Sequence, residues 1–383
     1  MIPISYNVRS LAVRKTSTAA AGLGMALVVF VFSSVLMLSN GLTKTLGRSA
    51  ADDVVVVLRK GSDNELSSGI EEGSMKIAVA AAGSGAKAVG EIVTVILLDK
   101  VGEEGVSNVQ VRGVPEEALA FRPTAKIVAG RAPKPGSDEA IVGKAIRGRF
   151  KGLDIGQKFE LKKNRSCTVV GVFEDGGSSF ESEAWADIHV VRTAFGREGL
   201  VSSIRVRLPG GSGAFDGFKA NVEQNRQLGL HVMREADFYE KQSQMTSMFI
   251  SITGTLIAVF FSIAAMIGAA ITMHSQVAHR QREIGTLRAL GFSRLTVLTS
   301  FLIESIVLAI LGGAVGAAAS LLLGFVEIST MNFATWSEIC LRFEPTPGIL
   351  VRSMILAVVM GVVGGFFPAI KAARTSPVAA MRA

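Results

Sequence analysis

The sequence predicts a membrane protein with four transmembrane helices and a large extracytoplasmic α+β domain between the first and second helices. Three observations carry this prediction. Four long stretches lack charged side chains, roughly 200 residues after the first stretch show short strand patterns, and the basic residues outside that interval gather in three segments. Hydrophobic residues make up 49% of the 383 residues and charged residues only 19%, against roughly a quarter in soluble domains.

The first uncharged stretch covers the 28 residues between Lys15 and Lys44. A bilayer core requires about 20 apolar residues in a helix, which satisfies its own backbone there, so we expect a transmembrane helix at 19–41. A cleaved signal peptide is the alternative, but its apolar run spans only about 7–15 residues, which favours a retained anchor. The other uncharged stretches predict helices at 247–273, 296–325 and 350–371.

Basic residues near the helix ends predict the orientation of these helices. The three basic segments contain Arg9, Arg14, Lys15, Arg280, Arg282, Arg288, Arg294, Lys371, Arg374 and Arg382, against one acid, Glu283. We therefore expect the N-terminal segment, the loop 274–294 and the tail 372–383 in the cytoplasm. The domain at 42–245 and the short acidic loop at 326–349 are expected outside.

The net charge of +8 has the same origin. Residues 42–245 carry 28 Lys+Arg and 27 Asp+Glu, so nearly all of the excess lies in the membrane half of the chain. A charge distributed in this way marks topology, and it excludes nucleic-acid binding as the reason for the basic composition. Membrane lipid is the partner that the composition itself implies.

Residues 42–245 show short β patterns broken by Gly, Pro and Asp. The expected strands are Val54–Leu58, Ile92–Leu98, Lys158–Leu161, Cys167–Phe173, Ser203–Leu208 and Leu230–Arg234. An amphipathic run at 215–228 precedes the last of them, and this strand–helix–strand order predicts an α+β module. The Gly/Ala/Ser-rich segment 61–90 has a weak pattern, and we expect a mobile edge there rather than a site.

The sequence contains no recognisable catalytic or metal-binding motif. It lacks H-E-x-x-H, G-x-S-x-G and C-x-x-C patterns, and Gly143-Lys144 is not followed by the residues of a Walker A motif. We therefore expect no catalytic residue, no metal and no cofactor held by this chain. Cys167 and Cys340 both fall in segments expected outside, where either one disulfide or two buried thiols would fit.

Glu304 is the only acid within the four predicted helices. An intramembrane carboxylate often marks a functional site. The alternative is a structural position near the cytoplasmic interface, since Arg294 lies less than three helical turns away, and the sequence favours this alternative. A secondary transporter normally uses several such groups at the midplane, so a single acid speaks against that class.

The loop 274–294 contains the most patterned cytoplasmic segment. Ile284, Leu287 and Leu290 recur every third residue and predict one apolar edge of a short helix. Arg280 and Glu283 are three residues apart and can pair, and Gly291 is a natural helix stop. The helix would offer a mixed apolar and basic ridge to a partner. An ordinary positive-inside loop is the other interpretation, and composition does not separate the two.

The resemblance of three motifs to a known family favours the partner-binding helix over the ordinary loop. The segment Arg282-Glu-Ile-Gly-Thr-Leu-Arg-Ala-Leu-Gly291 closely resembles the R-E-I-G-x-L-R-A-L-G signature of ABC transporter permeases of the MacB/FtsX/LolC superfamily. Phe301-Leu-Ile-Glu-Ser, followed by Gly312 and Gly316, is similar to the third helix of that family. The end of the chain, from Pro368 to Arg382, resembles its P-A-x-x-A-A terminus. Segments between 127 and 172 also resemble the periplasmic core domain of MacB type.

The resemblance implies a permease that couples ATP hydrolysis on another subunit to movement of periplasmic domains, a mechanism called mechanotransmission. The implied cargo is a lipoprotein, a peptide or a drug, and the implied location is the bacterial inner membrane. Because only about 18 residues precede the first helix, we expect the ATPase, with its ATP and Mg, in a separate chain present in two copies. A second permease copy, identical or related, is also implied, and the family allows a periplasmic adaptor and an outer-membrane component.

The resemblance also assigns roles to particular segments. Residues 1–18 look like the interfacial helix that precedes the first transmembrane helix in such permeases. Residues 280–292 look like the helix that docks on the ATPase. The residues expected to couple to the ATPase are Arg280, Arg282, Glu283, Ile284, Gly285, Leu287, Arg288, Leu290 and Gly291. An ATP-independent scaffold or signalling protein with a ligand-binding external domain is the alternative, and it would have no need of such a helix.

Two pairs of glycines four residues apart occur in the predicted helices, Gly312 with Gly316 and Gly361 with Gly365. Such pairs allow helices to approach closely, and we expect them to pack, although a merely tolerated glycine is the alternative. Pro368 is expected to kink or end the fourth helix at its cytoplasmic side, because proline lacks the backbone N–H that a helix uses.

Overall fold

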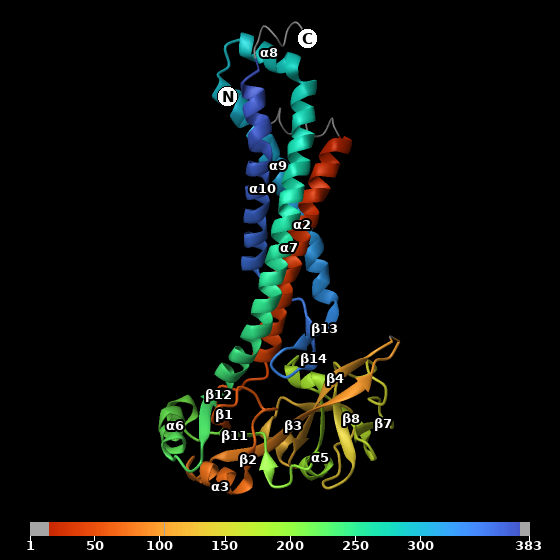
Figure 1. Cartoon of the computed structure of the whole chain (residues 1–383), viewed down its shortest axis with the longest axis vertical. Helices are drawn as coiled ribbons and strands as arrows, with labels where there is room; N and C mark the ends of the chain where they lie inside the picture. Colours follow the sequence, from red (N-terminus) through yellow and green to blue (C-terminus); the bar gives the residue numbers. More distant parts are fainter. Residues whose placement is uncertain (1–14, 103, 376–383) are drawn as a thin grey trace. The chain divides into compact units, whose positions relative to one another are not determined.

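The structure is a computed structural model that describes residues 15–102 and 104–375 (Figure 1). The expected interfacial helix at 1–18 and the tail at 372–383 therefore lie largely outside the described residues. The chain divides into two compact units. We call the described parts of Met1–Asn40, Phe249–Val326 and Arg342–Ala383 the helical unit, and Gly41–Met248 with Glu327–Leu341 the sheet domain.

Among the described residues, four helices are long and apolar enough to cross a membrane, in agreement with the sequence. They are α2 (Lys15–Gly47), α7 (Glu235–His279), α9 (Arg294–Leu321), which a 3₁₀ turn at Leu322–Phe325 extends, and α10 (Pro347–Ala373). With that 3₁₀ turn counted, each is longer than the predicted span. The largest difference is in α7, whose polar first turns belong to the sheet domain.

Local sequence fixes where α9 and α10 begin. The Ser293 side chain accepts a hydrogen bond from the backbone N–H of Thr296, and Thr346 accepts one from Ile349. Both are N-cap residues, which satisfy N–H groups that have no partner within the helix. Pro347 occupies the first turn of α10, where its missing N–H costs nothing.

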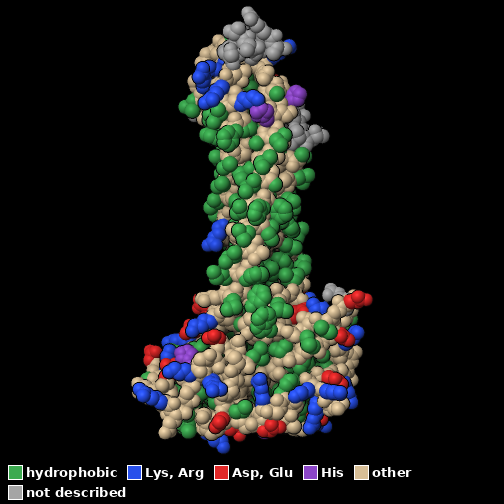
Figure 2. All heavy atoms as spheres, in the orientation of Figure 1, with side chains coloured by type: hydrophobic (Ala, Val, Ile, Leu, Met, Phe, Trp, Pro, Cys, Tyr) green, Lys and Arg blue, Asp and Glu red, His purple; other side chains and the backbone are tan. Residues whose placement is uncertain are grey.

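The helical unit presents apolar side chains to its surroundings (Figure 2). On α7, Leu256, Phe260 and Ile271 are each more than half exposed. Its interior is made of small clusters, one of which joins Val28 and Val29 of α2 to residues of α9 and α10. An outside as apolar as the inside is typical of a bundle surrounded by lipid, which agrees with the predicted membrane location.

The sheet domain contains a mixed ten-stranded sheet in the order β12-β1-β11-β3-β4-β9-β6-β8-β5, with β7 paired to β8. The β4–β9 and β6–β8 pairs are parallel and the others antiparallel. The strands are β1 (Val54–Arg59), β3 (Lys87–Asp99), β4 (Val106–Val114), β5 (Lys126–Gly130), β6 (Glu139–Gly143), β7 (Lys158–Lys162), β8 (Arg165–Glu174), β9 (Glu183–Asp187), β11 (Ser203–Arg207) and β12 (Leu230–Arg234).

Short elements complete the sheet domain. They are two small strand pairs, β2 (Ile70–Glu71) with β10 (Leu200–Val201) and β13 (Glu327–Asn332) with β14 (Ser337–Arg342), and four helices, α3 (Glu72–Ala80), α4 (Ala118–Phe121), α5 (Ile188–Phe195) and α6 (Phe215–Gln224). Apolar residues of α3, α5 and α6, such as Ala78, Val191 and Phe218, join one face of the sheet in a single core. The expected α+β class is therefore confirmed.

Two segments differ from their sequence interpretation. The segment 61–90, expected to be a mobile edge, contains α3, whose Ala78 is fully buried, and the start of β3. The loop expected at 326–349 contains the β13–β14 hairpin, which belongs to the sheet domain. The Cys340 N–H donates to Ser182 Oγ at 2.9 Å, and Asn108 Nδ2 donates to the Trp336 carbonyl at 2.6 Å. These partners lie more than 150 residues away, and no local pattern reveals them.

Candidate functional site

The predicted coupling segment forms α8 (Gln281–Ala289), which joins α7 to α9 at one end of the helical unit (Figure 1). Only Arg280 separates its start from the end of α7. Gly291 ends the segment with φ +95°, a left-handed conformation that glycine adopts without strain. The Phe292 N–H donates to the Leu287 carbonyl at 3.2 Å, which closes the helix end as in a Schellman motif.

The two faces of α8 differ in exposure. Ile284 is 2% exposed and packs with Val277 of α7 and Phe301 of α9, and Gly285 is also buried. Arg282 and Glu283 are exposed, Leu287 and Arg288 are half-buried, and Leu290 is 72% exposed. The expected apolar ridge is therefore divided. Ile284 anchors α8 to its own bundle, whereas Leu290, Arg282 and Glu283 are exposed.

Arg280 fixes the start of α8. Its side chain is 6% exposed, its Nε lies 3.0 Å from Glu283 Oε2, as the spacing predicts, and its Nη1 lies 3.1 Å from Glu304 Oε2. The guanidinium also stands 5.4 Å from the ring centroid of Phe301, which precedes Glu304 by one turn. Glu304, 2% exposed, therefore has a buried partner at the α7–α8 junction. The sequence placed Glu304 near the cytoplasmic interface, within three turns of Arg294, but did not identify a partner.

The four glycines expected to pack stand at close helix contacts. A Cβ atom on Gly312 would lie 2.6 Å from the Gly22 carbonyl oxygen of α2, and one on Gly316 would overlap the Ala26 carbonyl. On α10, a Cβ atom on Gly361 would lie 2.7 Å from Ala309 Cβ of α9. The fourth, Gly365, meets Ser305 of α9 in the same way. Side chains at these positions would force the helices apart.

Pro368 does not end α10, contrary to one of the two outcomes expected from the sequence. The helix continues through it to Ala373, and Pro368 itself is buried. Proline removes one backbone hydrogen bond, but neighbouring helices hold a membrane helix together on both sides of such a position. Here Ala369 and Ala372, just after the proline, pack in the same cluster as Phe301 of α9 and Met273 of α7.

A second candidate site, which the sequence did not reveal, lies on the other face of the sheet. Alternation along each strand places Val109 and Val111 in the apolar core and Arg112 on the opposite face. That face carries an ion cluster, which we define as Glu65, Glu91, Arg112, Arg122, Glu183, Arg205 and Glu235, all at most 6% exposed.

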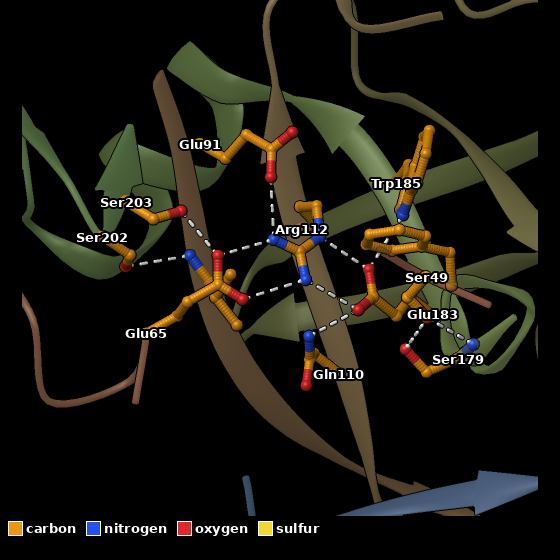
Figure 3. Close-up of polar contacts among 12 residues, drawn as sticks. Ser49, Glu65, Glu91, Gln110, Arg112, Ser179, Glu183, Trp185, Ser202 and Ser203 are labelled. Atoms are coloured by element: carbon orange, nitrogen blue, oxygen red, sulfur yellow. Dashed lines mark hydrogen bonds and ion pairs between the residues drawn. The ribbon is translucent and has the colours of Figure 1, made fainter. Parts of the chain in front are cut away.

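Arg112 stands at the centre of this ion cluster (Figure 3). Its Nε and Nη2 donate to the two carboxylate oxygens of Glu183 at 2.7 and 2.8 Å. Its Nη1 donates to Glu65 at 2.9 Å and to Glu91 at 2.8 Å. Such paired, hydrogen-bonded charges are the form in which ions are tolerated away from water. The cluster therefore connects β3, β4, β9 and the segment after β1.

Electrostatics favour the charged forms of Glu65, Glu91 and Arg112 in the ion cluster. Burial raises the pKa of Glu91, but the positive charges of Arg122, Arg112 and Arg205 outweigh it and lower this pKa to about 2. Burial likewise opposes ionisation of Glu65, and Arg112 and Arg205 again hold its pKa well below the usual range. For Arg112, burial lowers the pKa and the carboxylates of Glu183 and Glu65 raise it well above the usual value.

The two cysteines and the potential metal ligands form no further candidate site among the described residues. Cys167 and Cys340 are free thiols, both buried, so the two thiols rather than a disulfide are present. Burial, together with the nearby Asp138 carboxylate, raises the pKa of Cys167 to about 12. Within 15–102 and 104–375, no group of three or more His, Cys, Asp or Glu side chains is placed to hold a metal ion.

Two family models together match most of the chain. Residues 18–216 match the family model of the MacB-like periplasmic core domain, and residues 255–377 match that of the FtsX-like permease C-terminal region. Among curated relatives, the macrolide export ATP-binding/permease protein MacB of Escherichia coli K12 is 31% identical over 232 residues, which are 58% of this chain and 34% of the relative.

Two further proteins are similar to parts of this chain. A probable export ATP-binding/permease protein of Pseudomonas fluorescens is 27% identical over 251 residues, 63% of this chain and 37% of the relative, so the chain aligns with about a third of these proteins. The solved periplasmic region of MacB from Actinobacillus actinomycetemcomitans matches with a TM-score of 0.38 and 12% identity, over 50% of this chain and 92% of that one. Because the periplasmic-core model alone covers more than half of the sequence, the chain belongs to the family of MacB- and FtsX-like ABC transporter permeases.

Proposed function

We propose that this chain is the membrane subunit of an export ABC transporter in the bacterial inner membrane. The sheet domain is on the periplasmic side, and α8 and both termini are in the cytoplasm. Family membership supports the proposal, and the basic residues around α8 support the orientation because cytoplasmic loops of membrane proteins are enriched in Lys and Arg.

The observation that carries the proposal is the way in which α8 is held. A helix that transmits movement from a partner must be fixed to its own bundle and must expose a face to that partner. Ile284 and the buried Arg280–Glu304 pair fix α8, and Leu290, Arg282 and Glu283 form an exposed face of mixed character. Exposed apolar side chains rimmed by charges are typical of protein interaction surfaces.

The partner we propose is an ABC ATPase in a separate chain. Two ATPase subunits, holding ATP and Mg, dock on two permease copies, identical or related. Closure of the ATPases on ATP moves α8, and the long helices carry this movement to the sheet domain. In support, α2 and α7 each contribute residues to both units of the chain. The cargo belongs to one of the classes that the family resemblance implies: a lipoprotein, a peptide or a drug.

The test is a pair of matched substitutions, Leu290→Glu on α8 and Leu97→Glu on β3. The two leucines are exposed to a similar extent, 72% and 66%. A charge buried at an apolar contact costs at least about 1.4 kcal/mol, which is a tenfold loss of affinity. We expect Leu290→Glu to reduce binding of the co-expressed ATPase by about tenfold or more, and Leu97→Glu to leave it unchanged. Equal binding by both variants would contradict docking on α8, and no binding of the ATPase by the unmodified chain would favour an ATP-independent scaffold.

A further inference from the structure

The end of α2 and the start of α7 meet at one side chain in the sheet domain. Glu235 is the first residue of α7, and its side chain is fully buried. Its Oε2 accepts a hydrogen bond from the backbone N–H of Ala51 at 2.9 Å, and Ala51 lies four residues after the end of α2 at Gly47. One carboxylate oxygen therefore ties the segment that follows α2 to the first turn of α7.

The other carboxylate oxygen ties both helix ends to the sheet. Glu235 Oε1 accepts hydrogen bonds from Nη1 of Arg205 and, at 3.4 Å, from Nη1 of Arg122. Arg205 stands on β11, and its other nitrogens donate to Glu65 at 3.0 Å and to Glu91 at 3.2 Å. Through Arg205, Glu235 is thus connected to the rest of the ion cluster across the middle of the sheet.

Neighbouring contacts hold the same two helix ends. Ser49, two residues after α2, shares a hydrogen bond of 2.7 Å with Ser179 Oγ and accepts the Ser179 N–H at 2.9 Å (Figure 3). On α7, the ring of Tyr239, one turn after Glu235, packs edge-on against Phe180 with the ring centroids 6.1 Å apart. Both helix ends therefore contact the 3₁₀ turn at Ser179–Ser182. Glu235 in addition contacts the segment after α2, Arg205 of β11 and Arg122 after α4.

We infer that Glu235 is a positioning residue that joins α2 and α7 to the sheet domain, so that movement of these helices moves the domain as one body. The inference rests on the proposed function, since it concerns how ATP-driven movement reaches the sheet. The three groups that face the carboxylate are all hydrogen-bond donors. A carboxylate accepts from all of them, whereas an amide must turn its NH₂ group towards either Ala51 or the arginines.

This donor arrangement makes Glu235→Gln the decisive substitution. The side chain keeps its size, but whichever way the amide turns, a donor faces a donor, and either the link to α2 or the link to the sheet is lost. Glu240→Gln is the matched control, because it makes the same chemical change at an exposed position on α7, within two turns of Glu235. Arg122→Gln is a second variant, which removes the link at 3.4 Å together with the ion pair between Arg122 and Glu91 at 3.0 Å, and leaves the bonds of Glu235 to Arg205 and Ala51 in place.

The experiment measures movement of the sheet domain in the full chain bound to its ATPase. Spin labels are placed at Lys163→Cys in the sheet domain and at Phe325→Cys in the helical unit, both exposed positions. The native thiols are buried and stay unlabelled. The distance distribution is recorded without nucleotide and after trapping with ATP, Mg and vanadate, alongside ATP turnover. We expect Glu235→Gln to keep the nucleotide-free distribution and ATP turnover, and to lose at least half of the shift that ATP produces.

Glu240→Gln is expected to keep the full shift and Arg122→Gln to lose part of it. A full shift in Glu235→Gln would overturn the inference and leave the proposed function intact. If Glu235→Gln does not accumulate, a full shift in Arg122→Gln overturns the inference in its place. If the unmodified chain shows no shift while its ATPase hydrolyses ATP, both the role of Glu235 and the proposed coupling are overturned. That result differs from a full shift in Glu235→Gln, which overturns the role of Glu235 alone.

Discussion

The Arg280–Glu304 pair is the contact whose removal should loosen α8 most. Both side chains are almost fully buried, and the charged atoms are 3.1 Å apart. At an effective dielectric constant of about 20, the attraction at this distance is about 5 kcal/mol, part of which is offset by the cost of removing both ions from water. Removing one side chain takes away the buried ionic partner of the other, and such losses cost about 3–5 kcal/mol.

Three variants test this magnitude: Glu304→Leu, Arg280→Leu and the double variant. Each single substitution is expected to destabilise the attachment of α8 by about 3 kcal/mol. The double variant is expected to lose less than the sum of the two, because it removes both buried charges together, with a coupling energy of about 1–3 kcal/mol. Glu283→Gln is the control, because its carboxylate is exposed and an exposed ion pair contributes only about 0.2–1 kcal/mol.

The assay is the rate of tryptic cleavage after the exposed Arg282 in the full chain, followed by mass spectrometry. Cleavage of a segment that opens transiently follows the population of its open form. A loss of about 3 kcal/mol therefore corresponds to cleavage about 100-fold faster in each single variant, against at most a few-fold in Glu283→Gln. Cleavage of Glu304→Leu at the unmodified rate, or strictly additive effects in the double variant, would refute the reasoning.

Three further outcomes are expected. Gly312→Ala places a Cβ atom 2.6 Å from a carbonyl oxygen of α2 and should lower the unfolding free energy in detergent by about 1–3 kcal/mol. The control is Gly268→Ala, where a Cβ atom meets nothing within 4 Å and no loss is expected. Equal losses in the two variants would contradict helix packing at Gly312. The pKa of Glu91 in the folded protein, about 2, lies below its ordinary value of 4.5, so the stability that Glu91 provides should be constant above about pH 4.5 and lost as pH falls towards 2. Near-ultraviolet circular dichroism of the buried Trp185 measures this loss of folded structure. A loss that begins above pH 6 would argue against the ion cluster. Cys167 and Cys340, both buried, should react with a maleimide at pH 8 only after unfolding, and rapid labelling of the native chain would place them elsewhere.

The membrane half of the molecule could be predicted from sequence because its signals are local. A run without charges long enough to cross a bilayer defines each helix, and glycines four residues apart mark where helices approach. The left-handed Gly291 ends α8 where the pattern ends. The burial of Ile284 could not be predicted in the same way, since an apolar residue on a short helix can face either its own bundle or a partner, and only the packing of α7 and α9 decides.

The ion cluster could not be predicted because its pairs are distant in sequence. Arg112 and Glu183 are 71 residues apart, and Arg205 and Glu65 are 140 apart. Only the order and register of the strands bring them together. A weak signal was present, since Glu91, Arg112 and Arg205 each stand next to an apolar residue in strand-like segments. A charged residue at a position where both faces of a strand are buried indicates a buried partner, although the sequence does not identify it.

The central claim is that α8 is the surface on which an ABC ATPase docks. The most direct measurement is photo-crosslinking in intact cells, with a photoreactive residue at Leu290 on α8 and, as the comparison, at Leu256 on the apolar face of α7, which is also more than half exposed. The account predicts an adduct between this chain and the ATPase from position 290 and none from position 256. No ATPase adduct from position 290, or an equal yield from both positions, would contradict it.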